Sequence, residues 1–524
     1  MKTKILTYVA TAAMGLVANA EQKRPNILFL FSDDHALNAI SSYGGPLKDI
    51  APTPHIDSLA QEGALFENSF CANSICGPSR ACILTGKHSH KNGFMRNTGK
   101  GFDQSQWTVA KALKGAGYTT AVIGKWHLKT HPVAFDYWEV LPGQGSYYNP
   151  VFIQMDGSKK RFEGYATDIT TDKAINWLEK RDKTKPFFLM CQHKAPHRTF
   201  APALRHLNAF DGVEIPEPRT LFDDYKNRSI TLPKNEMEID RHMWWVYDLK
   251  VRQEEMDGQK LPGIMGRPVE YNRMTPLQKK QWDAYYGPLN KKFIADFKAG
   301  KLSHEDVVKW KYQRYIRNYL GTVKAVDENI GRMLDYLKVN GLDENTIVIY
   351  SSDQGFYLGE HGWYDKRWMF EESFKMPFLI KWPGVIKPGS RPKDLIQNID
   401  YAPTWLEMAG VEVPDDVQGR SIVPLLKGKV DDWRESVYYA YYEIGEHAVP
   451  QHYGVRTKTH KLFYLPATQE WQMFDLVKDP EEMVSVYENP EYSKVREELT
   501  QEYYRLRAYY EAPSYEEYAP KKKK

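Results

Sequence analysis

Residues 24–34, RPNILFLFSDD, contain a short and almost wholly apolar run that ends in two aspartates. An apolar run of this length, followed by turn residues, is typical of a strand that is buried on both faces of a parallel sheet. Similar runs recur along the chain and alternate with segments of helical pattern, so the sequence predicts an α/β fold with a doubly wound, mostly parallel sheet. The predicted strands are 24–31, 119–123, 186–191, 346–351 and 377–380, and the predicted helices are 53–63, 108–117, 168–181 and 312–340.

The pattern changes in two other regions. Residues 201–303 are polar, aromatic and irregular, and we interpret them as an excursion from the sheet rather than an independent domain. From about residue 437, short strands follow one another closely and a helix comes after them, which predicts a smaller C-terminal antiparallel-sheet-plus-helix subdomain. The predicted strands there are 439–443, 454–457, 461–465 and 471–475, and the predicted helix is 493–510.

Length and charge exclude some classes of protein. The chain has 524 residues, which is too many for one small core. Its 71 basic and 67 acidic side chains give a formal charge of +4, so nothing in the balance of charge predicts nucleic-acid binding. The four lysines at 521–524 are expected to be a solvated tail.

Residues 1–20 have the pattern of an export signal. Two lysines come first, residues 5–17 are mostly apolar, and Ala-Asn-Ala at 18–20 forms a cleavage site. The apolar run is too short to span a bilayer, and no cysteine follows the cleavage site directly. We therefore expect a mature chain that is secreted or periplasmic, without a stable membrane anchor.

The four cysteines are Cys71, Cys76, Cys82 and Cys191. They are too few to form the disulfide framework of an exported chain of this length. Three of them lie close together, but their spacing matches no common zinc pattern. We interpret Cys71, Cys82 and Cys191 as structural, and the meaning of Cys76 comes from its neighbours.

Residues 76–86, CGPSRACILTG, carry the most specific chemical signal. Pro78 favours the first turn of a helix, on which Cys76 and Arg80 share a face. Cys76 would then lie at the helix N-terminus, where free N–H groups and the helix dipole favour anions. A nucleophile there, next to a fixed guanidinium, suits attack on a sulfate or phosphate group. The alternative interpretation is a buried structural cysteine before a capped helix.

This segment resembles the signature of the type I sulfatases of the alkaline-phosphatase superfamily, C-x-P-S-R followed by Leu-Thr-Gly, at every signature position. The resemblance implies a sulfatase catalytic domain at 21–425 and a C-terminal subdomain at 426–524. It also implies that a formylglycine-generating or sulfatase-maturating enzyme oxidises Cys76 to formylglycine. The hydrated aldehyde of that residue would then be the nucleophile.

Carboxylates follow two of the predicted strands. Asp33 and Asp34 end the first run, and Asp353 and Gln354 follow the strand at 346–351. Neighbouring carboxylates at a strand end are costly unless they meet a cation, and an all-oxygen set suits calcium. The resemblance implies the same four ligands, although the family usually has Asn or His where Gln354 stands. The alternative for each pair alone is a helix cap or a turn.

Four basic residues lie just past predicted strand ends, where a doubly wound sheet places its ligand site. They are Lys125, His127, His197 and Lys366. The resemblance implies that Arg80, Lys125 and Lys366 hold the sulfate oxygens. It further implies that Asp353 acts as a base, that His197 protonates the leaving oxygen, and that His127 removes a proton from the nucleophile. A solvated surface residue is the alternative for each.

Several residues predict a sugar substrate. The rings of Trp363, Tyr364 and Trp368 surround Lys366 and are expected to offer faces for a pyranose. Asp365 and Arg367 are expected to bind sugar hydroxyls, and His447 and His452, expected in a loop of the C-terminal subdomain, to close the site.

The strings at 193–198 and 362–382 resemble bacterial sulfatases that act on the 6-O-sulfate of N-acetylglucosamine in heparan-type glycosaminoglycans. Alternatives are another sulfated sugar, such as 6-O-sulfated galactosamine or a 2-O-sulfated uronic acid, and a phosphoester hydrolase of the same superfamily. A non-catalytic glycan-binding protein is the alternative from another class.

Overall fold

The computed structural model describes residues 24–256, 258–430 and 432–518. The predicted export signal at 1–20 and the lysine tail at 521–524 lie outside these ranges, so both stay predictions.

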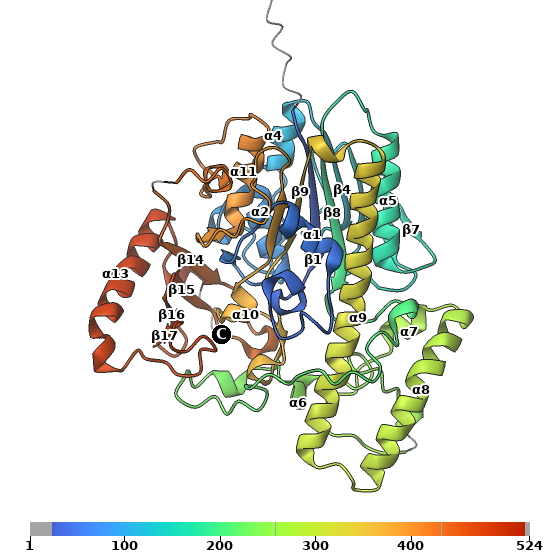
Figure 1. Cartoon of the computed structure of the whole chain (residues 1–524). Coiled ribbons are helices and arrows are strands. Elements are labelled where there is room, and N and C mark those ends of the chain that lie inside the picture. Colours follow the sequence, from blue (N-terminus) through green and yellow to red (C-terminus); the bar gives the residue numbers. More distant parts are fainter. Residues whose placement is uncertain (1–23, 257, 431, 519–524) are drawn as a thin grey trace, which may run out of the picture.

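A large mixed sheet lies at the centre of the molecule (Figure 1). Its strand order, within the described ranges, is β2 (Ala64–Leu65), β12 (Phe378–Lys381), β9 (Thr346–Ser352), β1 (Asn26–Asp33), β8 (Phe187–Pro196), β4 (Thr119–Lys125), β5 (Tyr137–Leu141), β6 (Val151–Ile153) and β7 (Lys159–Arg161). The strands β9, β1, β8, β4 and β5 run parallel to one another; the first four were predicted, and β5 was not. The prediction for 377–380 is wrong in direction, because β12 pairs antiparallel with β9. An apolar run reports burial on both faces and carries no information on strand direction.

Alternate residues of β1 point into two different cores. Ile27, Phe29 and Phe31 belong to one buried cluster, and Leu28 and Leu30 to another. Helices α2 (Cys76–Thr85), α4 (Val109–Gly115) and α11 (Tyr401–Met408) contribute to the first cluster. Helices α1 (Pro54–Glu62), α5 (Ala166–Lys180) and α9 (His304–Val339) contribute to the second. Both faces of the sheet are therefore covered, which confirms the doubly wound prediction.

The excursion at 201–303 contains more regular structure than predicted. Helix α8 (Pro276–Lys298) follows a capping box at Thr275, and Figure 1 shows it beside the first half of α9. Helix α9 begins at His304 rather than near residue 312, because a capping box starts it. The side chain of Ser303 accepts the backbone N–H of Asp306, and the backbone N–H of Ser303 donates to the Asp306 carboxylate. A third buried cluster joins the excursion to α9.

The C-terminal part is a separate antiparallel sheet with a helix on one face, as predicted. Its strands are β14 (Ser436–Tyr441), β15 (His452–Thr457), β16 (His460–Leu465) and β17 (Glu470–Asp475), paired in chain order. Helix α13 (Ser493–Tyr509) shares a buried cluster with them. The domain boundary after residue 425 stays a prediction. The shorter elements are β3 (Ser69–Phe70), β10 (Tyr357–Leu358), β11 (Tyr364–Asp365), β13 (Ile396–Gln397), α3 (Ser89–Asn92), α6 (Ile239–His242), α7 (Val269–Arg273), α10 (Glu371–Phe374), α12 (Val423–Leu426) and α14 (Tyr515–Tyr518).

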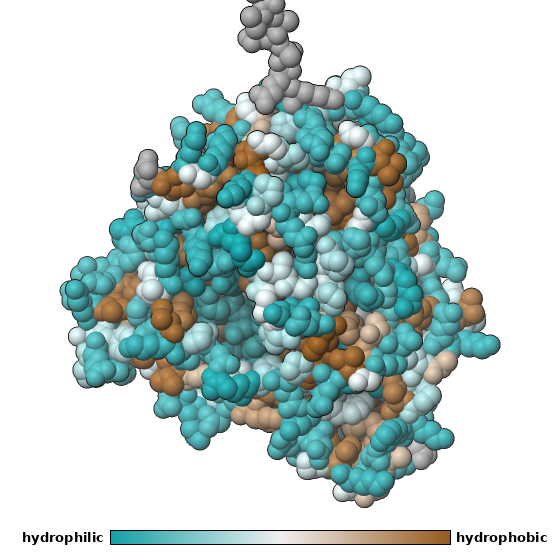
Figure 2. Space-filling model, viewed as in Figure 1, coloured by the Kyte–Doolittle hydropathy of each residue, from teal (hydrophilic) through white to brown (hydrophobic). Residues whose placement is uncertain are grey.

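The surface is that of an ordinary globular protein on the face in view. Figure 2 shows mostly hydrophilic residues there, with apolar residues scattered among them. Within the described ranges, no helix combines the length and the apolar character that crossing a bilayer requires.

Candidate active site

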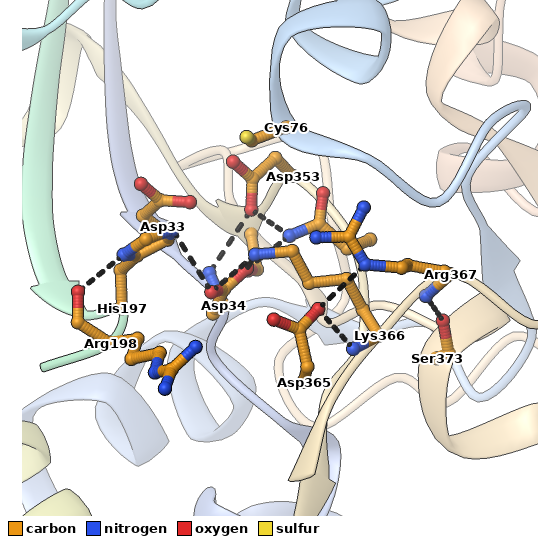
Figure 3. A network of polar contacts seen from close by, with 12 residues as sticks. Asp33, Asp34, Cys76, His197, Arg198, Asp353, Asp365, Lys366, Arg367 and Ser373 are labelled. Carbon is orange, nitrogen blue, oxygen red and sulfur yellow. Dashed lines mark hydrogen bonds and ion pairs between the residues drawn. The ribbon is translucent and has the colours of Figure 1, made fainter. Parts of the chain in front are cut away.

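The predicted site residues converge at the carboxyl ends of the parallel strands. Asp33 ends β1 and Asp34 follows it, Lys125 ends β4, His197 follows β8, and Asp353 follows β9. Figure 3 shows Asp33, Asp34, His197 and Asp353 around one centre, with Cys76 next to them. Neighbouring parallel strands end at the same edge of a sheet, which explains why residues far apart in sequence meet there.

Cys76 is the first residue of α2, as predicted. Its side chain is buried, and its Sγ atom lies 3.2 Å from Nδ1 of His127. Burial raises the pKa of the Cys76 thiol, against the opposing influence of Lys366. The unmodified sulfur is therefore protonated near neutral pH and is a weak nucleophile.

Arg80 lies one helical turn further along α2 and fixes the carboxylate of Asp353. Its Nε and Nη2 atoms donate to Oδ2 of Asp353 at 3.1 and 3.0 Å. Its Nη1 atom donates to the backbone oxygen of Lys125 at 2.5 Å and to Oε1 of Gln192 at 3.1 Å. Since a guanidinium offers several N–H groups in one plane, Arg80 links α2 to the ends of three strands.

The acidic residues have the character of a cation site. Asp33, Asp34 and His197 are buried, and each offers a ligand atom within 4.8 Å of the others. Oδ1 of Asp33 and Oε1 of Gln354 are buried and accept no hydrogen bond from the described residues, while Oδ2 of Asp33 is ion-paired with Lys125. Buried oxygens without donors are what a hard cation would satisfy. The donor set thus fits calcium, and it adds His197 to the predicted group.

Gln354 is oriented differently from its predicted role. We expected its carbonyl oxygen to face the ion, but its Nε2 atom donates to the carboxylates of Asp34 and Asp353. Two carboxylates attract the nitrogen end of an amide. A half-turn of the amide would bring Oε1 to the same place, so its role as a ligand stays a prediction.

The carboxylates are matched by basic side chains. Nζ of Lys366 donates to both oxygens of Asp34, at 2.8 and 2.7 Å, and Lys125 forms an ion pair with Asp33. Burial raises the pKa of Asp34 to about 7. Nε2 of His197 lies 3.6 Å from Asp34, and its Nδ1 contacts the backbone oxygen of Arg198 at 2.6 Å.

Both histidines are neutral in this surrounding. Burial, together with the nearby lysines, lowers the pKa values of His127 and His197 well below their ordinary range. A neutral imidazole at 3.2 Å from the atom at position 76 is able to accept a proton from that atom.

Asp365 and Arg367 form one wall of the site, next to Lys366 (Figure 3). Their side chains contact each other at 3.2 Å, and both residues have positive φ angles, 78° and 100°. A non-glycine residue in this conformation is strained, and such strain clusters at functional sites. His447 joins this wall, because its Nε2 atom lies 3.6 Å from Asp365.

Two predictions about this wall are wrong. The rings of Trp363, Tyr364 and Trp368 are buried inside the protein, so they offer no open face to a sugar. His452 lies in β15 rather than in a loop, and its buried ring packs on Trp368 at 5.0 Å. Tryptophan and tyrosine bury large apolar areas, and here all three rings pack in the protein interior. A direct role for His452 in binding stays a prediction.

Three nearby residues were missed. The Nδ2 atom of Asn97 lies 3.4 Å from Sγ of Cys76, and Gln192 contacts Arg80. Lys194 is buried with its Nζ over the ring of Tyr147, and burial lowers its pKa to about 8. Gln192 and Lys194 could have been found as strand-end polar residues, since both lie on β8 close to His197. No sequence signal marks Asn97.

Comparison with known proteins identifies the family. Residues 25–411 match the family model described as Sulfatase, and residues 359–509 match the one described as N-sulphoglucosamine sulphohydrolase, C-terminal. The chain belongs to the sulfatase family. An N-acetylglucosamine-6-O-sulfatase of Bacteroides thetaiotaomicron is 47% identical over 509 residues, which are 95% of this chain and 89% of the relative.

Two further relatives extend the comparison. The N-acetylglucosamine-6-sulfatase of Homo sapiens is 25% identical over 83% of this chain and 71% of its own length. A protein solved in complex with its substrate, D-glucosamine-2-N,6-O-disulfate, is similar with a TM-score of 0.88 and 46% identity, over 96% of this chain and 100% of the other. This chain thus shares its fold with that solved structure along almost its whole length, including the C-terminal sheet.

Proposed function

We propose that this sulfatase removes the 6-O-sulfate of N-acetylglucosamine in heparan-type glycosaminoglycans, with a formylglycine made from Cys76 as nucleophile and with Ca²⁺ as cofactor. One observation carries the proposal. Cys76 lies at the start of α2, next to His127, on the helix whose Arg80 holds Asp353. The 47% identity to an N-acetylglucosamine-6-O-sulfatase supports the substrate.

Oxidation of Cys76 by a maturating enzyme would supply a hydrated aldehyde, whose hydroxyl is a stronger nucleophile than the protonated thiol. Asp33, Asp34, Asp353 and Gln354, with His197 beside them, would hold Ca²⁺, and the ion would supply positive charge at a sulfate oxygen. The three aspartates and the three bases Arg80, Lys125 and Lys366 are formally neutral together. A divalent ion would therefore make the site positive, which suits an anionic sulfate ester.

The chain's own residues then have distinct roles. Arg80, Lys125 and Lys366 bind the sulfate oxygens and stabilise charge that develops on them. Asp353, which Arg80 orients, accepts the proton of the attacking group. His197, whose pKa the negative charge of a bound sulfate ester would raise, delivers a proton to the departing sugar oxygen in its protonated form. His127 accepts a proton from the atom at position 76. Asp365, Arg367 and His447 bind the hydroxyls of the sugar.

Export to the periplasm or the medium is part of the proposal and rests on the pattern of residues 1–20. A glycosaminoglycan substrate is too large to cross a membrane, which agrees with that location.

A panel of defined sulfated sugars tests the substrate. It contains 6-O-sulfated N-acetylglucosamine, 6-O-sulfated N-acetylgalactosamine, a 2-O-sulfated uronic acid disaccharide and N-sulfated glucosamine. We expect sulfate release mainly from the first. Release mainly from another member would support a sulfatase but reject this substrate. In a separate assay, faster turnover of an aryl phosphate than of an aryl sulfate would favour phosphoester hydrolysis. No turnover of any ester by matured protein would favour glycan binding alone.

A further inference from the structure

The C-terminal sheet reaches the nucleophile through one buried carboxylate. Glu443 follows β14 and is fully buried. Its Oε2 atom accepts the backbone N–H of Asn97 at 2.6 Å, and its Oε1 atom accepts the hydroxyl of Thr98 at 2.6 Å. Both oxygens therefore hold the same short segment of the catalytic domain, more than three hundred residues earlier in the sequence.

That segment places an amide on the reacting atom. Nδ2 of Asn97 lies 3.4 Å from Sγ of Cys76, on a sulfur that His127 also contacts. The other end of the same amide, Oδ1, is buried and accepts no hydrogen bond from the described residues. Asn97 thus presents a donor to residue 76, and its unused acceptor lies next to Gly77. A single sulfur atom uses only the donor.

The start of α2 is shaped to admit this amide. A Cβ atom on Gly77 would lie 2.4 Å from Oδ1 of Asn97 and 2.7 Å from the ring of Phe94. Contacts this short do not occur between real atoms, so any side chain at position 77 would displace the amide or α2. The absence of a side chain there keeps the amide against residue 76.

The position of Asn97 depends on Glu443. Residues 93–108, which connect α3 to α4, contain no regular helix or strand, so side-chain contacts set their position. Glu443 is buried, and burying a carboxylate is costly unless other groups offset that cost. Hydrogen bonds from residues 97 and 98 offset part of that cost, and the buried charge in turn makes these two bonds strong.

We propose that Glu443 is a positioning residue for the nucleophile at residue 76, acting through Asn97, whose amide meets both hydroxyls of the hydrated aldehyde. The inference rests on the proposed function, because only a residue with two hydroxyl groups engages the donor and the acceptor of Asn97 together. It assigns the C-terminal sheet a part in the chemistry as well as in the fold.

A double-mutant cycle tests the proposal. Glu443→Gln, Asn97→Ala and the double variant are each measured on the sulfated sugar that the wild-type enzyme hydrolyses best, with rates divided by the formylglycine content from intact mass. We expect each single variant to lower kcat by 10- to 100-fold with KM changed less than threefold. We expect the double variant to be no slower than Asn97→Ala alone, because both changes remove one function.

Asp475→Asn is the matched control. Asp475 ends β17 of the same sheet, is buried, and also accepts backbone N–H groups and a tyrosine hydroxyl. The Asp475→Asn variant should leave kcat unchanged. Combined with Asn97→Ala, it should give the kcat of Asn97→Ala alone. The proposal would be overturned if the kcat of the Glu443→Gln and Asn97→Ala double variant fell by the product of the two single effects. A normal kcat in Glu443→Gln alone would also overturn it.

A second readout needs no catalysis. In a Cys76→Ala background, amide hydrogen exchange at Asn97 should be at least tenfold faster with Glu443→Gln and unchanged with Asp475→Asn. Unchanged exchange with Glu443→Gln would overturn the positioning role. If the wild type hydrolyses no sulfate ester while exchange responds as expected, the proposed function fails and the contact between the two parts of the chain stands.

Discussion

The groups around Cys76 suit a nucleophile other than the encoded thiol. The thiol is buried, and burial raises its pKa, so the sulfur is protonated near neutral pH. Yet His127 and Asn97 both contact it, and Arg80 on the same helix holds Asp353. The thiol is thus a weak nucleophile surrounded by a proton acceptor, an orienting amide and a fixed guanidinium. This arrangement is chemically useful if residue 76 carries hydroxyl groups.

Arg80 should not be replaceable by lysine. We expect Arg80→Lys to lower kcat/KM by at least 100-fold with little change in thermal stability, because one ammonium is unable to bond Asp353, Gln192 and the Lys125 carbonyl together. Arg205→Lys is the matched control, since Arg205 makes a two-point contact with Asp168 at the surface. Activity close to wild type in Arg80→Lys would contradict the account.

Sequence reasoning placed single residues well where they follow strands and less well where they do not. The sequence predicted that six side chains would meet, and contacts join them at one site: Cys76, Arg80, Lys125, His127, His197 and Asp353. Asn97 and Glu443 meet only through a contact between distant parts of the chain, which no local pattern encodes. The burial of Trp363 and Trp368 likewise depends on which neighbours cover them.

At the level of elements, the sequence predicted four of the five parallel strands, most of the helices that cover them and the C-terminal sheet, and it missed β5 and α11. It missed α8 and the first two turns of α9, although Ser303 and Asp306 form a capping box that the sequence displays. These helical segments show no clear apolar pattern in the sequence, because a helix that is only partly buried has a weak apolar stripe. The reversed direction of β12 was not readable from its apolar residues.

The cap of α9 should contribute measurably to stability. Ser303→Ala removes a side-chain acceptor for the N–H of Asp306, and we expect the free energy of unfolding to fall by about 1 kcal/mol. Ser303→Asp keeps an acceptor and should stay near wild type. Denaturant unfolding at fixed pH measures both, and equal stability of the alanine variant and the wild type would rule out this cap.

The contact between α10 and the C-terminal sheet should depend on pH. Burial raises the pKa of Glu482 to about 7, against the influence of Lys461, which also pairs with Glu371. The folded chain then binds the proton of the Glu482 carboxyl more tightly than the unfolded chain does. The contribution of Glu482 to the free energy of unfolding therefore falls as pH rises from the ordinary pKa of glutamate to about 7.

Glu482→Gln removes this titration. We therefore expect the variant to gain about 1–3 kcal/mol relative to wild type between pH 5 and pH 8. Thermal unfolding at both pH values measures the change. A difference between variant and wild type that stays constant with pH would contradict the assignment.

At the scale of the whole molecule, one charged centre joins parts of the chain that lie far apart in sequence. Asp33 and Asp34 come from β1, Asp353 and Gln354 follow β9, and Lys366 comes from the strained segment near β11. The C-terminal sheet adds Glu443 and His447 to the same region. A ligand bound at this centre would therefore stabilise the whole catalytic domain.

Calcium should stabilise the folded chain. Metal-free protein should unfold at a lower temperature than protein with excess Ca²⁺, because a ligand at 100 times its Kd adds about 2.7 kcal/mol to the free energy of unfolding. Asp33→Asn should abolish the Ca²⁺ response, since it removes the charge of a buried carboxylate whose Oδ1 atom has no hydrogen-bond donor among the described residues. An equal response in Asp33→Asn would place the ion elsewhere, and no response in wild type would argue against the proposed cofactor.

The most direct test of the central claim follows two quantities in the same preparations. Formylglycine content at residue 76 is measured by mass spectrometry, and sulfate release from 6-O-sulfated N-acetylglucosamine is measured in samples matured to different extents, with Cys76→Ala as the control. The account predicts a rate proportional to the formylglycine fraction and no release by Cys76→Ala. Release that is independent of that fraction, or that persists in Cys76→Ala, would contradict it.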